Sequence, residues 1–298
     1  MQRIEIRDFD DPRLAPYRNL KDAELANRCG RFIVEGRTNL EVLLEASIHA
    51  PDSILLSERL HRSMARWLAA SNPDCPLYVA EQAVLDRVVG FSFHRGCLAT
   101  CPRPVALDPA ALAARCIEAE PAPRILVLEG VGNHDNVGGI FRNARALGGR
   151  AVILCPESCD PLYRKAIRTS MGGSLCLPFA RATRWPEGLE SLRGLGYQIL
   201  ALDPGVEGDS LDRVAEAARG PTALLLGTEG AGLTQAALAR SDRRVRIPME
   251  AGVDSLNVAM AAGIALHALC RRGESIVPGA ATARPREAEC FGQESSDE

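Results

Sequence analysis

Residues 125–155 read ILVLEGVGNHDNVGGIFRNARALGGRAVILC, and this stretch decides the fold. Two apolar runs of strand length, ILVLEG and AVILC, enclose a segment in which Ile140, Phe141, Ala144 and Leu147 recur at helical spacing. Continuous apolar strands joined by a helix are typical of a parallel sheet whose two faces are both covered by helices. Ligands of such sheets bind beyond the carboxyl ends of the strands, so the polar loop before the helix is a candidate binding loop.

The same alternation of strands and helices continues to the end of the domain. The expected strands are residues 125–130, 151–155, 175–180, 197–203, 222–230 and 245–248. The expected helices are residues 136–147, 161–171, 189–195, 211–218, 233–241 and 255–272. The sequence therefore predicts an α/β domain with a mostly parallel sheet and helices on both faces, spanning residues 124–273.

A smaller α/β unit precedes this domain. Residues 1–22 are polar and are expected to be an irregular N-terminal extension, and residues 23–102 alternate between short helical and strand-like segments. Residues 103–123 contain several prolines around a short helix and are interpreted as a linker. Residues 274–298 are rich in small and acidic residues, so we expect a disordered tail.

Composition limits the class of protein. The formal net charge of −3 is concentrated in the tail, which holds six acids and two arginines, so the rest of the chain is close to neutral. No apolar run is long enough to span a membrane and no signal-peptide core is present, which predicts a cytoplasmic protein. The ten cysteines are scattered without the two-residue spacing of common zinc and redox sites, so we expect reduced thiols and no metal.

The common nucleotide-binding loops are absent. A dinucleotide fingerprint that begins at Gly130-Val131-Gly132 needs a glycine where Asp135 stands. No lysine follows a glycine, which excludes a P-loop, and Asp203-Pro204-Gly205-Val206 lacks the Gly-x-Gly turn of the commonest methyltransferase sheet. An ordinary nicotinamide or nucleotide enzyme is therefore disfavoured, and the ligand geometry must be a different one.

Three segments near the strand ends resemble, in order and spacing, the three motifs of the SpoU branch of the SPOUT superfamily. The first is Asn-x-Gly-x-x-x-Arg, with Asn136, Gly138 and Arg142. The second is the small-residue loop LGTEGAGL at residues 226–233, and the third combines IPM at 247–249 with SLNV at 255–258. Each motif alone is weak, but all three together cover residues 125–272 and make a specific match.

The resemblance implies a fold, a reaction and partners. Members of this family are S-adenosylmethionine-dependent RNA 2′-O-ribose methyltransferases with a deep trefoil knot and an obligate homodimer. The expected substrate is structured RNA, with ribosomal RNA favoured and transfer RNA as the alternative. A non-catalytic RNA-binding protein on the same scaffold is a further alternative, which a lost motif residue would favour, but every motif residue is present. The front unit resembles the substrate-recognition domain of many members.

The resemblance also assigns site residues. Backbone groups of the second and third motifs are expected to hold the cofactor, because glycine lets the backbone approach a ligand closely. The expected cofactor-binding residues are Leu226, Gly227, Gly232, Ile247, Met249, Ser255 and Leu256. The expected catalytic residues are Asn136, Arg142, Glu229, Ser255 and Asn257.

Ordinary structural roles compete with these assignments. Ser255 is a natural N-cap of the last helix, and Asn136 is expected to cap the first helix and to contact Arg142 or the ribose. Glu229 follows an apolar strand, and it either orients the active-site arginine, contacts RNA or is simply a solvated carboxylate. The start of the last helix is expected to face the ribose and phosphate of the target nucleotide.

Arg142 has two possible catalytic roles. In the family the matching arginine is proposed to accept the proton of the 2′-hydroxyl. A guanidinium is essentially always protonated in proteins, so an electrostatic role, in which Arg142 holds the target phosphate and stabilises the forming alkoxide, is the alternative that we favour. The front domain adds four candidate RNA contacts, each of which also fits an ordinary surface position: Arg31, Arg37, His94 and Arg95.

Overall fold

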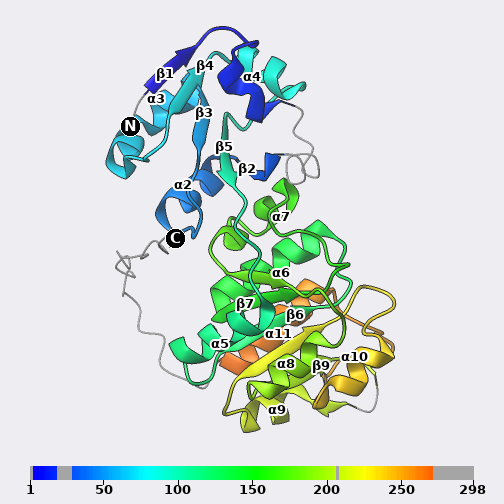
Figure 1. Cartoon of the computed structure of the whole chain (residues 1–298). Helices are drawn as coiled ribbons and strands as arrows, with labels where there is room; N and C mark the ends of the chain where they lie inside the picture. Colours follow the sequence, from blue (N-terminus) through cyan, green and yellow to red (C-terminus); the bar gives the residue numbers. More distant parts are fainter. Residues whose placement is uncertain (1–2, 19–28, 206–207, 271–298) are drawn as a thin grey trace, which may run out of the picture.

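The computed structural model describes residues 3–18, 29–205 and 208–270. They form two α/β units, each built around its own sheet (Figure 1). The expected acidic tail, residues 274–298, and residues 23–28 at the start of the expected front unit lie outside the described residues.

The first unit contains a mixed five-stranded sheet in the order β1-β4-β3-β5-β2. Its strands are β1 (Arg3–Ile6), β2 (Arg31–Glu35), β3 (Ser53–Ser57), β4 (Leu77–Ala80) and β5 (Cys97–Pro102). Its helices are the 3-10 helix η1 (Pro12–Tyr17), α2 (Arg37–Glu45), α3 (Glu58–Ser71) and α4 (Gln82–Val89). β1, β4 and β3 run parallel to one another, whereas β5 pairs antiparallel with both β3 and β2.

The expectation of an irregular segment over residues 1–22 is wrong for β1 and η1. The short RIEI run becomes a strand because it pairs with β4 at the edge of the sheet, a partner that no local pattern reveals. The 3-10 helix then buries Leu14 and Tyr17 against the sheet. This N-terminal segment is therefore part of the folded unit.

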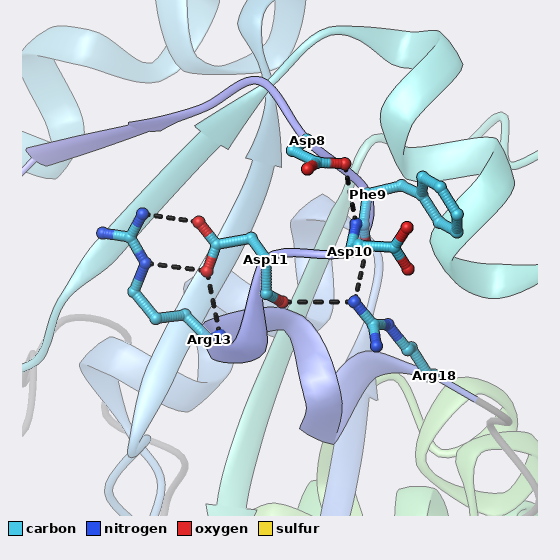
Figure 2. Close-up of polar contacts among 6 residues, drawn as sticks. All are labelled: Asp8, Phe9, Asp10, Asp11, Arg13 and Arg18. Atoms are coloured by element: carbon cyan, nitrogen blue, oxygen red, sulfur yellow. Dashed lines mark hydrogen bonds and ion pairs between the residues drawn. The ribbon is translucent and has the colours of Figure 1, made fainter.

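Local side chains hold the turn between β1 and η1 (Figure 2). The carboxylate of Asp11 caps η1 by accepting from the backbone N–H of Arg13, and it also binds the Arg13 guanidinium. Arg18, which follows η1, donates to the carbonyl oxygens of Phe9 and Asp11 and so ties the end of η1 to the turn before it. The polar residues that look irregular in sequence thus serve as caps.

The second unit contains a seven-stranded, fully parallel sheet in the order β10-β12-β9-β11-β6-β7-β8. Its strands are β6 (Arg124–Leu128), β7 (Gly149–Leu154), β8 (Phe179–Arg181), β9 (Gln198–Leu202), β10 (Asp209–Ser210), β11 (Thr222–Leu226) and β12 (Arg243–Arg246). Its helices are α5 (Pro109–Ala119), α6 (His134–Leu147), α7 (Arg164–Thr169), η2 (Gly173–Leu175), α8 (Gly188–Gly194), α9 (Leu211–Ala217), α10 (Gln235–Arg240) and α11 (Val258–Cys270).

Helices cover both faces of this sheet, which confirms the predicted fold class. Side chains alternate along β6, so Leu126 and Leu128 join one buried cluster and Ile125 and Val127 join the other. The first cluster includes residues of α6, α9 and α11, and the second includes residues of α5, α8 and α10. Strand order alone does not define a knot, so the trefoil knot stays a prediction.

Two local expectations need correction. The strand expected over residues 175–180 begins only at Phe179, because Leu175 closes the 3-10 helix η2 and Pro178 lacks the N–H that a ladder requires. Helix α5 lies within residues 103–123, which are interpreted above as a linker, and it buries Leu112, Ala113 and Cys116 against the large sheet.

The two units share one hydrophobic cluster. Leu162, Ile167 and Leu175 of the second unit lie in the cluster that fills one side of the first sheet. A Cβ atom at Gly172 would stand 2.8 Å from Val42 of α2, so the backbone of one unit contacts the side chains of the other. Ser47 donates to the carbonyl oxygen of Leu175 across the same boundary.

The cysteines in the described part of the chain are free thiols. Burial raises the pKa of Cys97 to about 12 and that of Cys159 to about 11, so both stay protonated at neutral pH. Within the same residues, no group of three or more His, Cys, Asp and Glu side chains could hold a metal ion. No helix there is long and apolar enough to cross a membrane.

Candidate active site

A cavity of about 420 Å³ lies at the carboxyl ends of three neighbouring strands, β12, β9 and β11. All the residues expected to bind the cofactor line it: Leu226, Gly227, Gly232, Ile247, Met249, Ser255 and Leu256. Glu229 and Asn257, from the expected catalytic set, line it as well. The second and third motifs, separated in sequence, therefore form the walls of one pocket.

Further lining residues were not among the expected site residues, although Thr228, Gly230 and Val258 lie within the quoted motifs: Leu202, Asp203, Pro204, Thr228, Gly230, Val258 and Ala261. Leu202 is the last residue of β9, and Asp203 and Pro204 follow it, so all three lie beside β11, the neighbouring strand in the sheet. A sequence shows that β9 ends near Asp203, but it does not show that β9 and β11 are neighbours. The general rule that ligands bind beyond strand ends is the one signal that marks Asp203.

The second motif forms a tight loop after β11. Its ends meet where Thr228 bridges Gly232, whose N–H donates to the Thr228 carbonyl oxygen. Gly230 and Gly232 have φ of +87° and +68°, a conformation that side chains rarely adopt. A Cβ atom at Gly227 would stand 2.4 Å from the carbonyl carbon of Gly232, so the loop closes only with glycine there.

We therefore expect Gly227→Ala to open the loop and to weaken S-adenosylmethionine binding about tenfold or more, as displaced backbone groups lose one or two hydrogen bonds. Isothermal titration calorimetry measures the affinity, and thermal unfolding measures the stability. Gly220→Ala is the matched control, because its Cβ atom would have no heavy atom within 4 Å. Equal affinities for wild type and Gly227→Ala would contradict the close packing of this loop.

Asn257 links the three motifs. Its side-chain amide donates to Asn136 Oδ1 at 2.9 Å and to Glu229 Oε1 at 2.8 Å. Asn136 is buried, whereas Glu229 and Asn257 are exposed at the mouth of the cavity. Sequence analysis predicts that Glu229 orients an arginine or contacts RNA, but its observed partner is Asn257.

The expected caps are wrong at both helices. Helix α11 begins at Val258, and the Asn257 oxygen accepts from the backbone N–H groups of Ala259 and Met260, so Asn257 and not Ser255 is the capping residue. Helix α6 is capped by Asn133, which accepts from Asp135 N–H, while Asn136 lies inside the first turn. Ser255 lines the cavity instead.

The glycines of the first motif allow close helix packing. A Cβ atom at Gly138 would stand 2.1 Å from Thr169 Oγ1 of α7, and one at Gly139 would stand 2.8 Å from the Cβ atom of Ala259 in α11. Asn143 of α6 also donates to the Ala259 carbonyl oxygen. Helix α6 is thus held between α7 and α11, which places Asn136 beside Asn257.

Arg142 lies outside the cavity. Its side chain is exposed on α6, and it forms no ion pair or hydrogen bond within the part of the chain that the structure describes. Asn136 does not contact it. Glu229, Ser255 and Asn257 thus line the cavity, and Asn136 is linked to it by its hydrogen bond with Asn257, whereas Arg142 does not line it.

Glu129 is a buried carboxylate that the sequence analysis did not assign. It follows β6 and accepts from Trp185 Nε1 at 2.6 Å, from Thr234 N–H at 2.9 Å and from Thr234 Oγ1 at 2.8 Å. Thr234 caps α10 directly after the second motif. Glu129 therefore anchors the far end of the cavity loop to the sheet.

The four expected RNA contacts of the first unit differ in their surroundings. Arg31 pairs with Asp52 and Arg37 pairs with Glu41, both within the first unit. His94 contacts Ser92 at 3.3 Å. Arg95 binds the buried carboxylate of Glu35, beside helix α7 of the second unit.

Solved structures share this architecture over nearly the whole chain. An AdoMet-bound rRNA methyltransferase from Sinorhizobium meliloti aligns with a TM-score of 0.74 and 23% identity, covering 92% of this chain and 100% of its own. A protein described as an RNA 2′-O ribose methyltransferase aligns with a TM-score of 0.70 and 26% identity, covering 90% and 98%.

Sequence comparison gives nearer relatives. An uncharacterized tRNA/rRNA methyltransferase of Mycobacterium tuberculosis is 40% identical over 280 residues, which span 92% of this chain and 94% of the relative. A protein of the same description from Mycobacterium bovis matches equally well. The family model described as SpoU rRNA Methylase matches residues 123–267, which contain the cavity and all three motifs. The chain therefore belongs to the SpoU rRNA methylase family.

Proposed function

We propose that this RNA methyltransferase transfers the methyl group of S-adenosylmethionine to a ribose 2′-hydroxyl of structured RNA, with ribosomal RNA as the substrate. The observation that carries the proposal is the Asn136–Asn257–Glu229 group beside a cavity whose volume suits a small-molecule cofactor. The solved relative described as a 2′-O ribose methyltransferase supports the choice of the 2′-hydroxyl.

The cofactor supplies an electrophilic methyl group when it is bound in the cavity. The chain must then align the hydroxyl with that group, and alignment supplies up to roughly 7–11 kcal/mol in ideal intramolecular reactions. Asn257 and Glu229, at the mouth of the cavity, offer an amide and a carboxylate that orient a ribose. Arg142, exposed and without an acidic partner among the described residues, holds the phosphate of the target nucleotide.

Transfer of labelled methyl groups to RNA tests the proposal. Ribosomal and transfer RNA from cells that lack the gene are incubated separately with the protein and S-adenosylmethionine, and the nucleosides are then separated. We expect 2′-O-methylated nucleosides in the ribosomal fraction. Label only on bases would refute 2′-O transfer, and label only in transfer RNA would refute the substrate choice. Cofactor binding without any transfer would favour the non-catalytic alternative.

We further propose that the protein acts as a homodimer through the second unit. Met260 and Ile264 lie four residues apart on α11, with 61% and 41% of their surfaces exposed. We expect wild type to sediment as a dimer and Met260→Glu/Ile264→Glu to sediment as a monomer, because charges on this apolar face oppose its burial. Val105→Glu, at a residue that is 88% exposed, is the control. A monomeric wild type would contradict the proposal.

A further inference from the structure

A buried carboxylate gathers arginines from both units. Glu35, the last residue of β2, has only 6% of its side chain exposed. Its Oε1 atom lies 2.9 Å from Arg95 Nε of the first unit. Its Oε2 atom lies 3.5 Å from a terminal nitrogen of Arg164 and 4.0 Å from one of Arg168, both on α7 of the second unit.

The charges of this cluster do not balance. Arg95 and Arg168 share the single carboxylate of Glu35, which leaves an excess of one positive charge among these three groups. An ion pair that only joined the two units would need a single arginine. Arg95 and Arg168 keep 49% and 38% of their side chains exposed, so an anion from solution can reach both. Guanidinium groups held in fixed positions are well suited to phosphate oxygens.

Backbone geometry favours the same arrangement. Gly36, directly after Glu35, has φ of +92°, and a Cβ atom there would stand 3.7 Å from a terminal nitrogen of Arg95. The end of the Arg95 side chain therefore lies near the start of the loop that follows β2, beside the Glu35 carboxylate. The ion pair with Glu35 restrains the guanidinium group there, which lowers the entropy that Arg95 loses on binding a phosphate.

Helix α7 connects this cluster to the candidate active site. Lys165, next to Arg164, pairs with Asp135 at 2.7 Å, and Asp135 precedes Asn136. Gly138 packs against Thr169 at the other end of α7. Because one short helix contacts both Glu35 and the first motif, an RNA strand that crosses α7 passes from the first unit to the first motif.

We propose that Arg95 and Arg168, gathered by Glu35, form a phosphate-binding site that spans the two units and holds the RNA backbone beside the catalytic centre. The inference rests on the proposed function, since it names the path of that substrate. Glu35 is a positioning residue, and Arg95 and Arg168 are the RNA contacts. Arg95 is the one residue of the four expected from sequence that belongs to this site.

The test is RNA binding by the full chain at several salt concentrations. A fluorescently labelled RNA hairpin is titrated with wild type and with Arg95→Gln/Arg168→Gln between about 50 and about 300 mM salt. Each lost phosphate contact lowers the slope of log affinity against log salt by about 0.7 to about 0.9. We therefore expect the double variant to bind about tenfold more weakly at low salt, with a slope reduced by one to two.

Controls separate phosphate binding from a structural role. Arg62→Gln removes an exposed arginine that pairs with Glu58 on α3, and it should leave affinity and slope unchanged. Arg95→Lys/Arg168→Lys keeps both charges and should restore most of the slope. Thermal unfolding reports any loss of fold, and Glu35→Gln should lower the melting temperature because three guanidinium groups lose their common counter-charge.

The outcomes distinguish this proposal from the proposed function. A double variant that folds and binds RNA with the wild-type slope overturns the phosphate site, whatever the methyl-transfer assay shows. A reduced slope in a protein that transfers no methyl group supports the phosphate site and refutes the proposed reaction. Wild type that binds the hairpin without salt dependence also overturns the phosphate site.

Discussion

Arg142→Ala is expected to lower the rate of methyl transfer by about 100-fold to about 1,000-fold, the usual cost of removing one group that stabilises developing charge. Its affinity for S-adenosylmethionine should change little, because Arg142 does not line the cavity. Single-turnover transfer measures the rate, and calorimetry measures the affinity. The exposed position of the side chain also predicts an unchanged melting temperature.

Arg145→Ala is the matched control for this variant. Arg145 lies one turn further along α6 and is also exposed, so it shares the helix and the charge of Arg142 but not the motif position. We expect its transfer rate to stay within severalfold of wild type. Equal losses in both variants would indicate a general electrostatic attraction for RNA. A parallel loss of cofactor affinity in Arg142→Ala would show that Arg142 supports the pocket.

Asn257→Asp is expected to abolish transfer at neutral pH while it keeps helix α11 intact. The substituted carboxylate still accepts from the N–H groups of Ala259 and Met260 and still caps the helix. Its second carboxylate oxygen replaces the amide nitrogen that donates to Asn136 and Glu229. The substituted carboxylate and that of Glu229 then face each other in place of the hydrogen bond of 2.8 Å. Like charges at that distance drive the groups apart.

The pH dependence of this variant is a sharp test. Protonation of either carboxyl group restores a donor between the two residues, so the transfer rate of Asn257→Asp should rise as the pH falls, relative to wild type. Asn257→Ala removes both the cap and the link, and it should lose about 1 kcal/mol of stability as well as activity. Wild-type activity of Asn257→Asp at alkaline pH would show that the link between the motifs is dispensable.

The large sheet could be predicted because its strands are buried on both faces. β6, β7, β9 and β11 appear in the sequence as apolar runs that no local alternative explains. β1 could not be predicted, since its charged RIEI sequence becomes a strand only through its pairing with β4. Helix α5 was expected, but its packing on the large sheet depends on tertiary contacts that proline spacing does not indicate.

The candidate site, like the fold, could be predicted from the sequence only in part. The three motifs alone were sufficient to choose seven residues that line one cavity. That these residues bind the cofactor stays a prediction. The choice of capping residues failed, because several polar residues precede each helix and only the backbone geometry decides among Asn133, Asn136, Ser255 and Asn257. The contact between Glu35 and α7 joins residues more than a hundred positions apart, and no local pattern signals it.

The place of β11 in the large sheet has a consequence for how the chain is made. β11 lies between β6 and β9, yet it is synthesised after both. At about 5 to 20 residues per second, the roughly ninety residues from β6 to β11 take about 5 to 20 seconds to leave the ribosome. During that interval the edge of β6 that later pairs with β11 has no native partner, and unpaired edges of this kind are prone to aggregation. Yield of native protein should therefore depend on elongation rate and on chaperones that cover this edge.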